Sequence, residues 1–313
     1  MRLIHPTAPN AYTTSPLDRA GLRREDEAWV QARYDDPASL FVPVWRGKTL
    51  ARRGETEAEA SFLSGESAVR LRAHARVWAL LGLLGDRALF ALDISGIDDP
   101  RPLVPEADAF EDLRALTGVL PDRDASILAH ARGLIHWRLR HGFCGVCGAR
   151  CQPRSAGHML ACTGCGANHF PRTDPAVIML VTREDQVLLG HSQRFPSRVM
   201  YSTLAGFVEP GESLEEAVAR EVLEEAGVRV GRVYFHSSQP WPYPASIMLG
   251  FYAEALSDVI TIDPEELRDA RWFTRAELRD PAGHGFELPS RHSIARRLID
   301  DWLGADEASM VGV

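Results

Sequence analysis

The segment 204–228, LAGFVEPGESLEEAVAREVLEEAGV, constrains the fold most strongly, because it concentrates negative charge directly after a glycine-containing turn. It contains seven glutamates and one basic residue, Arg220. Ser213 is a candidate N-cap, with Glu216 three residues later as its capping-box partner. Gly227 is a candidate C-terminal stop. The segment therefore predicts a helix that begins near Ser213 and ends before Gly227.

The glutamates of this helix divide into two sets at about 100° per residue. The apolar sector consists of Leu214, Ala217, Val218 and Val222. Glu221 and Glu225 fall inside this sector and Glu224 falls at its edge, whereas the two glutamates of the first turn lie toward solvent. Clustered, partly buried carboxylates cannot all stay ionised without a counter-charge, and Arg220 is expected to neutralise one at most. We therefore expect the inward set to bind Mg²⁺ or Mn²⁺, which prefer oxygen ligands.

A second feature is a cluster that holds all five cysteines of the chain. Two Cys-x2-Cys pairs, Cys144/Cys147 and Cys162/Cys165, are each followed by glycine, which favours a tight turn that points backbone N–H groups at thiolates. Two such turns predict a tetrahedral, four-thiolate zinc ribbon whose zinc is structural. A pair of redox-active CxxC motifs is the disfavoured alternative, and Cys151 lacks the spacing of a ligand.

The composition is that of a globular protein, with a net charge of −8 over 313 residues. This charge argues against sequence-independent binding to nucleic acid, which needs a basic face. The apolar run 77–94 is interrupted by Asp86 and Arg87 and predicts buried strands, not a membrane span. We expect a soluble, cytoplasmic protein.

The remaining patterns predict an alternation of strands and helices. Strands are expected at 39–45, 87–95, 174–185, 186–193, 230–239, 246–256 and 270–278, and helices at 125–141 and 293–303. Residues 1–140 carry no motif to which chemistry can be assigned.

The acidic segment resembles a known family signature. Its spacing Gly206-x5-Glu212-x7-Arg220-Glu221-Val222-x-Glu224-Glu225-x-Gly227-Val228 is similar at every defined position to the Nudix box, G-x5-E-x7-R-E-U-x-E-E-x-G-U, in which U is aliphatic. The resemblance implies an α/β/α sandwich around a mixed sheet, and hydrolysis of a nucleoside diphosphate linked to another group. It also implies that Glu221, Glu224 and Glu225 hold divalent metal ions.

A second signature narrows the substrate. In 238–246, SQPWPYPAS, prolines alternate with aromatic residues, so the rings are held stiffly enough to stack on a flat base; a structural turn is the alternative. The segment resembles the SQPWPFPxS signature of NADH pyrophosphatases of the NudC type, with Tyr243 in place of Phe. That family also has a zinc ribbon before the Nudix domain. The implied order is an N-terminal α/β domain (1–140), a zinc ribbon (141–172) and a catalytic Nudix domain (173–313).

The resemblance implies cleavage of NADH or NAD⁺ to NMN(H) and AMP, removal of NAD caps from RNA 5′ ends, and a homodimer. Carried over residue by residue, the implied metal ligands are the Ala205 carbonyl, Glu221, Glu224, Glu225 and Glu266, with Glu225 as the general base. The implied substrate contacts are Phe170, Gln239, Pro240, Trp241, Pro242, Tyr243, Pro244, Ala245, Ser246 and Ala295. The family's acidic contact between the cysteine pairs has no counterpart in 152–161.

Two other functions stay open at this point. One is a Nudix enzyme for another dinucleotide or for ADP-ribose, against which the SQPWPYPAS segment argues. The other is a non-catalytic RNA-binding protein that uses the ribbon, against which the intact glutamate set argues.

Overall fold

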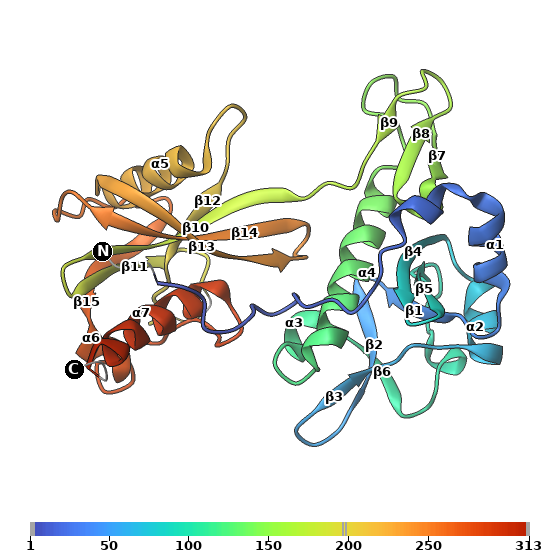
Figure 1. Cartoon of the computed structure of the whole chain (residues 1–313), viewed down its shortest axis with the longest axis horizontal. Coiled ribbons are helices and arrows are strands. Elements are labelled where there is room, and N and C mark those ends of the chain that lie inside the picture. The colour runs from blue at the N-terminus through green and yellow to red at the C-terminus, as the bar shows by residue number, and fades with distance from the viewer. Residues whose placement is uncertain (1–3, 196, 198, 311–313) are drawn as a thin grey trace. The chain divides into compact units, whose positions relative to one another are not determined.

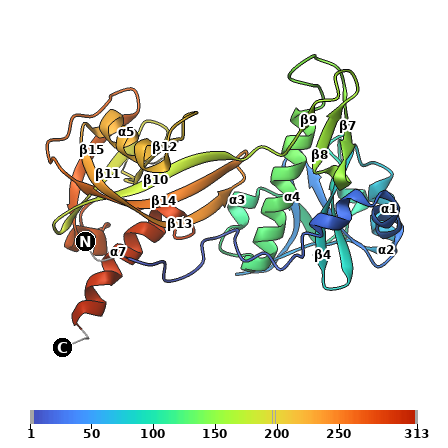
Figure 2. The same ribbon diagram turned by 45° about the horizontal axis from the view of Figure 1, so that its top comes forward.

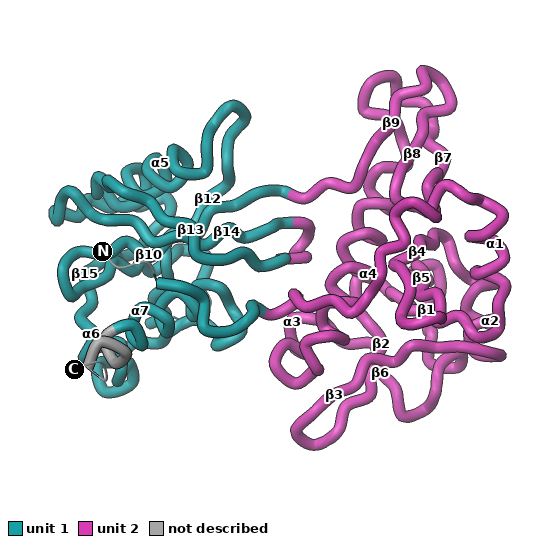
Figure 3. Tube along the Cα trace, in the orientation of Figure 1, with its two compact units in different colours: residues 1–10, 174–240, 246–313 teal, residues 11–173, 241–245 magenta. Residues whose placement is uncertain are grey.

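The structure is a computed structural model that describes residues 4–195, 197 and 199–310. The chain divides into two compact units (Figure 3). Unit 1 comprises residues 1–10, 174–240 and 246–313, and unit 2 comprises residues 11–173 and 241–245. The loop 241–245, at the centre of the SQPWPYPAS segment, therefore belongs to the unit that holds the N-terminal region and the cysteine cluster.

Unit 1 is built on a mixed six-stranded sheet of order β13-β14-β10-β11-β15, with β12 paired to β10. Strand β10 is parallel to β14 and antiparallel to β11 and β12. The strands are β10 (Asp174–Arg183), β11 (Gln186–Ser192), β12 (Leu204–Phe207), β13 (Val230–Trp241), β14 (Ser246–Ala255) and β15 (Leu267–Thr274). The helices are α5 (Leu214–Ala226), α6 (Arg275–Arg279) and α7 (Ile294–Met310).

Helices α5 and α7 cover opposite faces of this sheet (Figure 1). Successive side chains of a strand point to opposite faces, and β10 supplies both cores in this way. Val177, Met179 and Val181 pack with the buried face of α5, whereas Ile178 and Leu180 pack with α7. The expected α/β/α sandwich is confirmed. The predicted strand 270–278 begins earlier, at Leu267, and ends earlier, at Thr274, because its last residues form α6.

The predicted acidic helix is confirmed at both ends. The Ser213 side chain accepts a hydrogen bond from the Glu216 backbone, and the Glu216 side chain accepts one from the Ser213 backbone, which completes the capping box. Gly227 ends the helix in the left-handed region at φ 69°, where glycine has no steric penalty.

Unit 2 contains a six-stranded sheet of order β3-β2-β1-β5-β4, with β6 paired to β2. Helix α4 (Asp122–Arg140) packs on one face of this sheet (Figure 2). The strands are β1 (Leu40–Trp45), β2 (Lys48–Arg53), β3 (Ala58–Ala60), β4 (Val77–Leu84), β5 (Arg87–Asp93) and β6 (Asp108–Glu111). The other helices are η1 (Gly21–Glu25), α1 (Glu27–Asp35), α2 (Gly65–Arg72), η2 (Arg101–Leu103) and α3 (Leu113–Leu116).

The cysteine-rich segment of unit 2 forms a three-stranded sheet of order β7-β8-β9. Its elements are β7 (Cys151–Arg154), the short 3-10 turn η3 (Ser155–Gly157), β8 (Met159–Cys162) and β9 (Asn168–His169). In the described part of the chain, no helix has the length and apolar character needed to cross a bilayer.

Candidate active site and zinc centre

The four paired cysteines converge as predicted. Their sulfur atoms all lie within 4.8 Å of one another, with Cys144 Sγ 3.7 Å from Cys165 Sγ and Cys147 Sγ 3.4 Å from Cys162 Sγ. A tetrahedron with Zn–S bonds of about 2.3 Å has S···S edges of about 3.8 Å. The four thiols therefore fit a closed zinc site, and Cys151 stands outside this group.

Backbone geometry explains why glycine follows each cysteine pair. Gly148 and Gly166 have φ of 76° and 75°, in the left-handed region that favours glycine. The resulting turns direct the N–H groups of Cys165 and Gly164 at Cys162 Sγ, at 3.4 and 3.3 Å, which lowers the pKa of Cys162 to about 6. Hydrogen bonds of this kind stabilise the thiolate that zinc requires.

One contact to the zinc ligands was missed in the sequence. His169 Nε2 lies 3.3 Å from Cys144 Sγ, so the imidazole contacts a predicted zinc ligand and is not itself one of the four ligands. The signal that could have found it is the position of His169 at the end of the ribbon, where β9 pairs with β8.

In unit 1, strand β12 and helix α5 bring two features of the Nudix box into contact. A Cβ atom on Gly206 would lie 1.8 Å from the Glu221 carboxyl carbon. No side chain fits there, so Gly206 is needed because the Glu221 carboxylate lies directly over its backbone. The box glycine thus fixes the position of a predicted metal ligand.

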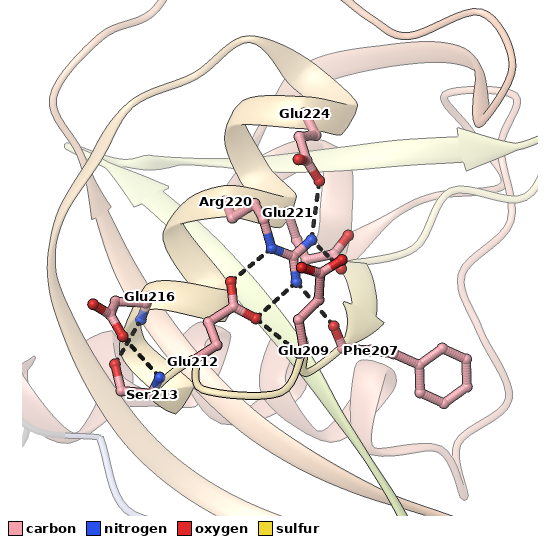
Figure 4. A network of polar contacts seen from close by, with 8 residues as sticks. All are labelled: Phe207, Glu209, Glu212, Ser213, Glu216, Arg220, Glu221 and Glu224. Carbon is pink, nitrogen blue, oxygen red and sulfur yellow. Dashed lines mark hydrogen bonds and ion pairs between the residues drawn. The ribbon is translucent and has the colours of Figure 1, made fainter.

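Arg220 contacts more carboxylates than its place on the helical wheel suggested, although its single positive charge still balances only one of them, as expected. Its guanidinium donates to Glu212 at 2.6 Å, to Glu221 at 2.9 Å, to Glu224 at 3.0 Å and to the Phe207 carbonyl at 2.9 Å (Figure 4). The hydrogen bond from Arg220 lowers the pKa of Glu212 to about 2. The planar fork of arginine suits several acceptors at once, so one side chain joins the turn 207–212 to α5.

Glu225 lies outside this network and is the least compensated carboxylate of the helix. Burial, followed by the charge of Glu221, raises the pKa of Glu225 to about 8. The backbone N–H of Ala205 donates to its carboxylate, and the charges of Glu266 and Arg194 also act on it. Burial also raises the pKa of Glu221. The structure thus brings together Ala205 of β12, Glu221 and Glu225 of α5, and Glu266, which come from three separate segments of the sequence.

Glu224 differs from the other two glutamates of the motif. Its side chain is 59% exposed, compared with 14% for Glu221. The prediction that Glu224 faces inward is wrong, because its place at the edge of the apolar sector puts it beside Arg220 at the surface. Glu266 is also exposed and pairs with Arg194 at 3.4 Å, a partner that the sequence did not suggest.

The aromatic loop makes its contacts within unit 2. The Tyr243 hydroxyl lies 2.7 Å from the Tyr12 hydroxyl, which also contacts Thr117. Arg114 and Arg132 lie over the Tyr243 ring, at 4.3 and 5.0 Å from its centroid. The hydroxyl that distinguishes Tyr243 from the family phenylalanine therefore has a hydrogen-bond partner.

The other predicted substrate contacts have varied surroundings. Gln239 is fully buried, and its side chain bonds the backbone of His292 and Ile294 at the start of α7. Ala295 is buried in the core beneath α7, whereas Phe170 is 65% exposed. Pro242 is buried, and Pro240, Trp241, Ala245 and Ser246 are partly buried. Pro244 is exposed and follows a cis peptide bond.

Three family profiles match consecutive parts of the chain. A NUDIX domain matches residues 172–295, and an NADH pyrophosphatase zinc ribbon domain matches residues 139–170. An NADH pyrophosphatase-like rudimentary NUDIX domain matches residues 38–137, in the region where the sequence revealed no motif.

Curated relatives agree with these profiles. The NAD-capped RNA hydrolase NudC of Deinococcus radiodurans is 36% identical over 85% of this chain and 88% of its own length. The chain belongs to the NADH pyrophosphatase family of Nudix hydrolases. The NudC of Stutzerimonas stutzeri is 48% identical over 56% of this chain, and NAD-capped RNA hydrolase NUDT12 of Homo sapiens is 41% identical over 59%. These two alignments span only 61% and 43% of those relatives.

Proposed function

We propose that this protein hydrolyses the pyrophosphate of NADH and NAD⁺ to NMN(H) and AMP, and that it removes NAD caps from RNA 5′ ends. The observation that carries the proposal is the pair Glu221 and Glu225, held beside the Gly206 turn with raised pKa values. Burial and mutual repulsion disfavour the ionised forms of these two carboxyl groups, and a bound divalent cation would stabilise them. The names of the relatives, NAD-capped RNA hydrolases, support the choice of substrate.

The ligands proposed for the divalent metal ions are Glu221, Glu225, Glu266 and the Ala205 carbonyl, with Glu224 as a further candidate. This all-oxygen set suits Mg²⁺ or Mn²⁺. When bound, such ions neutralise charge that develops on the phosphoryl oxygens and acidify a water molecule.

Glu225 is proposed as the general base. It accepts a proton from the water whose oxygen attacks phosphorus, while the bond from that phosphorus to the bridging oxygen breaks. Its carboxylate lies beside Glu221 and the Ala205 backbone, and a carboxylate within hydrogen-bond reach of a water molecule can accept its proton. Arg220 is a positioning residue, because it holds Glu221 and the turn 207–212 together.

The proposed substrate contacts are Phe170, Gln239 to Ser246 and Ala295. We also propose a homodimer, on the family resemblance. A cytoplasmic location is also proposed, because one tight cysteine cluster suits a metal site and not the disulfide framework of a secreted protein.

Product analysis tests the proposed activity. NADH, NAD⁺, ADP-ribose and NAD-capped RNA are each incubated with the full chain at several Mg²⁺ and Mn²⁺ concentrations, and the products are separated by chromatography. AMP and NMNH are expected from NADH, and release of NMN is expected from capped RNA. Faster cleavage of ADP-ribose than of NADH would contradict the proposed substrate. Sedimentation of the same preparation tests the dimer.

A further inference from the structure

Unit 2 contains a cavity of about 200 Å³ among η1, α1, β4 and η3. Its lining includes the arginines Arg24, Arg138 and Arg154, the residue Trp78 and the turn Ser155–Gly157. Glu27 is the acidic residue of the lining. Three cations and one anion therefore line a small cavity that is open to solvent.

The hydrogen bonds of these arginines go to backbone carbonyl groups. Arg24 Nε donates to the Arg19 carbonyl at 2.9 Å, and Arg154 Nη1 donates to the Pro153 carbonyl at 3.3 Å. Arg138 Nη1 lies 3.2 Å from the Trp78 carbonyl and 3.3 Å from that of Gly157. Carbonyl groups satisfy donors but carry no net charge. Within the residues that the structure describes, none of the three arginines has a carboxylate oxygen within 4.0 Å.

Arg138 provides the clearest sign of missing negative charge. Its Nε is buried and has no hydrogen-bond partner among the described residues. Burial lowers the pKa of Arg138 to about 10. Burial and the charge of Arg19 lower the pKa of Arg24, although the nearby charge of Asp18 acts in the opposite direction. A buried cation is stable only when it is paired or hydrogen-bonded.

The turn η3 is formed tightly against this guanidinium. Ser155, Ala156 and Gly157 have consecutive positive φ values of 48°, 52° and 91°. A Cβ atom on Gly157 would lie 2.7 Å from Arg138 Nη1, so only glycine fits there. Turns of this kind can form concave anion sites, and here the Ser155 hydroxyl donates to an anionic group, the Glu25 carboxylate, at 3.2 Å.

We propose that this cavity binds a phosphate dianion, either free or as the head group of a small ester, with Arg24, Arg138 and Arg154 as its charged contacts. The guanidinium fork matches phosphate oxygens in geometry. Pockets for drug-sized ligands begin near about 300 Å³, so a cavity of 200 Å³ admits a smaller molecule than a dinucleotide. The proposal is independent of the hydrolase activity, because all its residues belong to unit 2.

Calorimetric titration of the full, zinc-loaded chain with inorganic phosphate, without added Mg²⁺ or Mn²⁺, tests this site. We expect saturable binding that weakens about tenfold in Arg24→Gln and in Arg154→Gln, since each loses one charge-assisted contact. The Arg154 side chain is exposed, so its substitution is expected to leave the thermal midpoint unchanged. Arg101→Gln is the matched control, because Arg101 pairs with Asp99 at the surface of the same unit; its phosphate affinity is expected to equal that of the wild type.

Two further measurements locate the ligand and identify its source. Glu225→Gln changes the catalytic site in unit 1 and is expected to leave phosphate affinity unchanged. Tighter binding of ribose 5-phosphate than of inorganic phosphate would indicate an ester as the natural ligand, and the reverse order would indicate free phosphate. Absence of saturable binding at millimolar phosphate would overturn the proposal. So would affinities of Arg24→Gln and Arg154→Gln equal to that of the wild type.

Discussion

The zinc ribbon and the Nudix box are two metal-binding regions in which negative ligands are clustered in different ways. The four thiols of the ribbon already lie within 4.8 Å of one another, and no carboxylate group of this kind occurs among the residues that the structure describes. In the Nudix box, Arg220 forms ion pairs with Glu212, Glu221 and Glu224. Glu225 has no part in these pairs, and its pKa is raised. The comparison teaches that the thiol site is formed by its own turns, whereas the proposed catalytic site leaves Glu225 outside the ion pairs that Arg220 makes.

The largest expected effect is loss of the ribbon in Cys162→Ser. Zinc contributes about 10–16 kcal/mol to the folding of isolated zinc-finger peptides, and three ligands cannot close the tetrahedron. We expect loss of the bound zinc, measured by elemental analysis, and rapid proteolysis within 142–172. Cys151→Ser is the control and is expected to keep one zinc per chain. Equal zinc content in the two variants would contradict the assignment of Cys162 as a ligand and Cys151 as a bystander.

The next effect concerns turnover in Glu225→Gln. Removal of the proposed base is expected to lower the rate of NADH hydrolysis about 10²–10⁴-fold, with an unchanged circular dichroism spectrum. Glu215→Gln, on the exposed side of the same helix, is expected to retain the wild-type rate. Hydrolysis at the wild-type rate by Glu225→Gln would show that the role assigned to Glu225 is wrong.

A pH effect on stability follows from the same residue. In protein without added Mg²⁺ or Mn²⁺, the folded-state pKa of Glu225 is about 8, compared with an ordinary value of 4.5. The folded state therefore binds a proton on Glu225 more tightly than the unfolded state does. The stability that this proton contributes is lost as the pH rises from 4.5 to 8. The expected loss in the free energy of unfolding is on the order of 3 kcal/mol.

Chemical denaturation at pH 5 and pH 8.5 measures this loss, and the difference between wild type and Glu225→Gln isolates it from other groups. Added Mn²⁺ is expected to stabilise the wild type more at pH 8 than at pH 6, because its ligands must be deprotonated. If the free energy of unfolding changed equally with pH in the wild type and in Glu225→Gln, the raised pKa of Glu225 would be contradicted.

The smallest expected effect is that of Arg220→Lys. Lysine keeps the charge but loses the fork that reaches the glutamates and the Phe207 carbonyl. We expect a loss of about 1–2 kcal/mol in the free energy of unfolding. We also expect a lower kcat for NADH, with little change in KM. Arg229→Lys, at an exposed position of the same unit, is the control. An Arg220→Lys enzyme with wild-type kcat would mean that charge alone, without the fork, positions Glu221.

The sequence by itself determined the features that depend on neighbours along the chain. The acidic helix, its capping box and its glycine stop follow from spacing within 204–228, and the four zinc ligands follow from two short repeats. Most strands of the unit 1 sheet, and β1, β4 and β5 of unit 2, were predicted from apolar runs, whereas β2, β3, β6 and β12 were not.

Only the tertiary structure decided the features that join distant segments. The approach of the Glu221 carboxylate to the Gly206 backbone, the contact of Tyr243 with Tyr12 and the arginine-lined cavity of unit 2 arise where separate elements pack together, and sequence spacing alone does not give them. The physical reason is that periodicity reports burial and turn geometry, which are local properties. Which charges meet, and which are left without a partner, depends on how strands and helices pack.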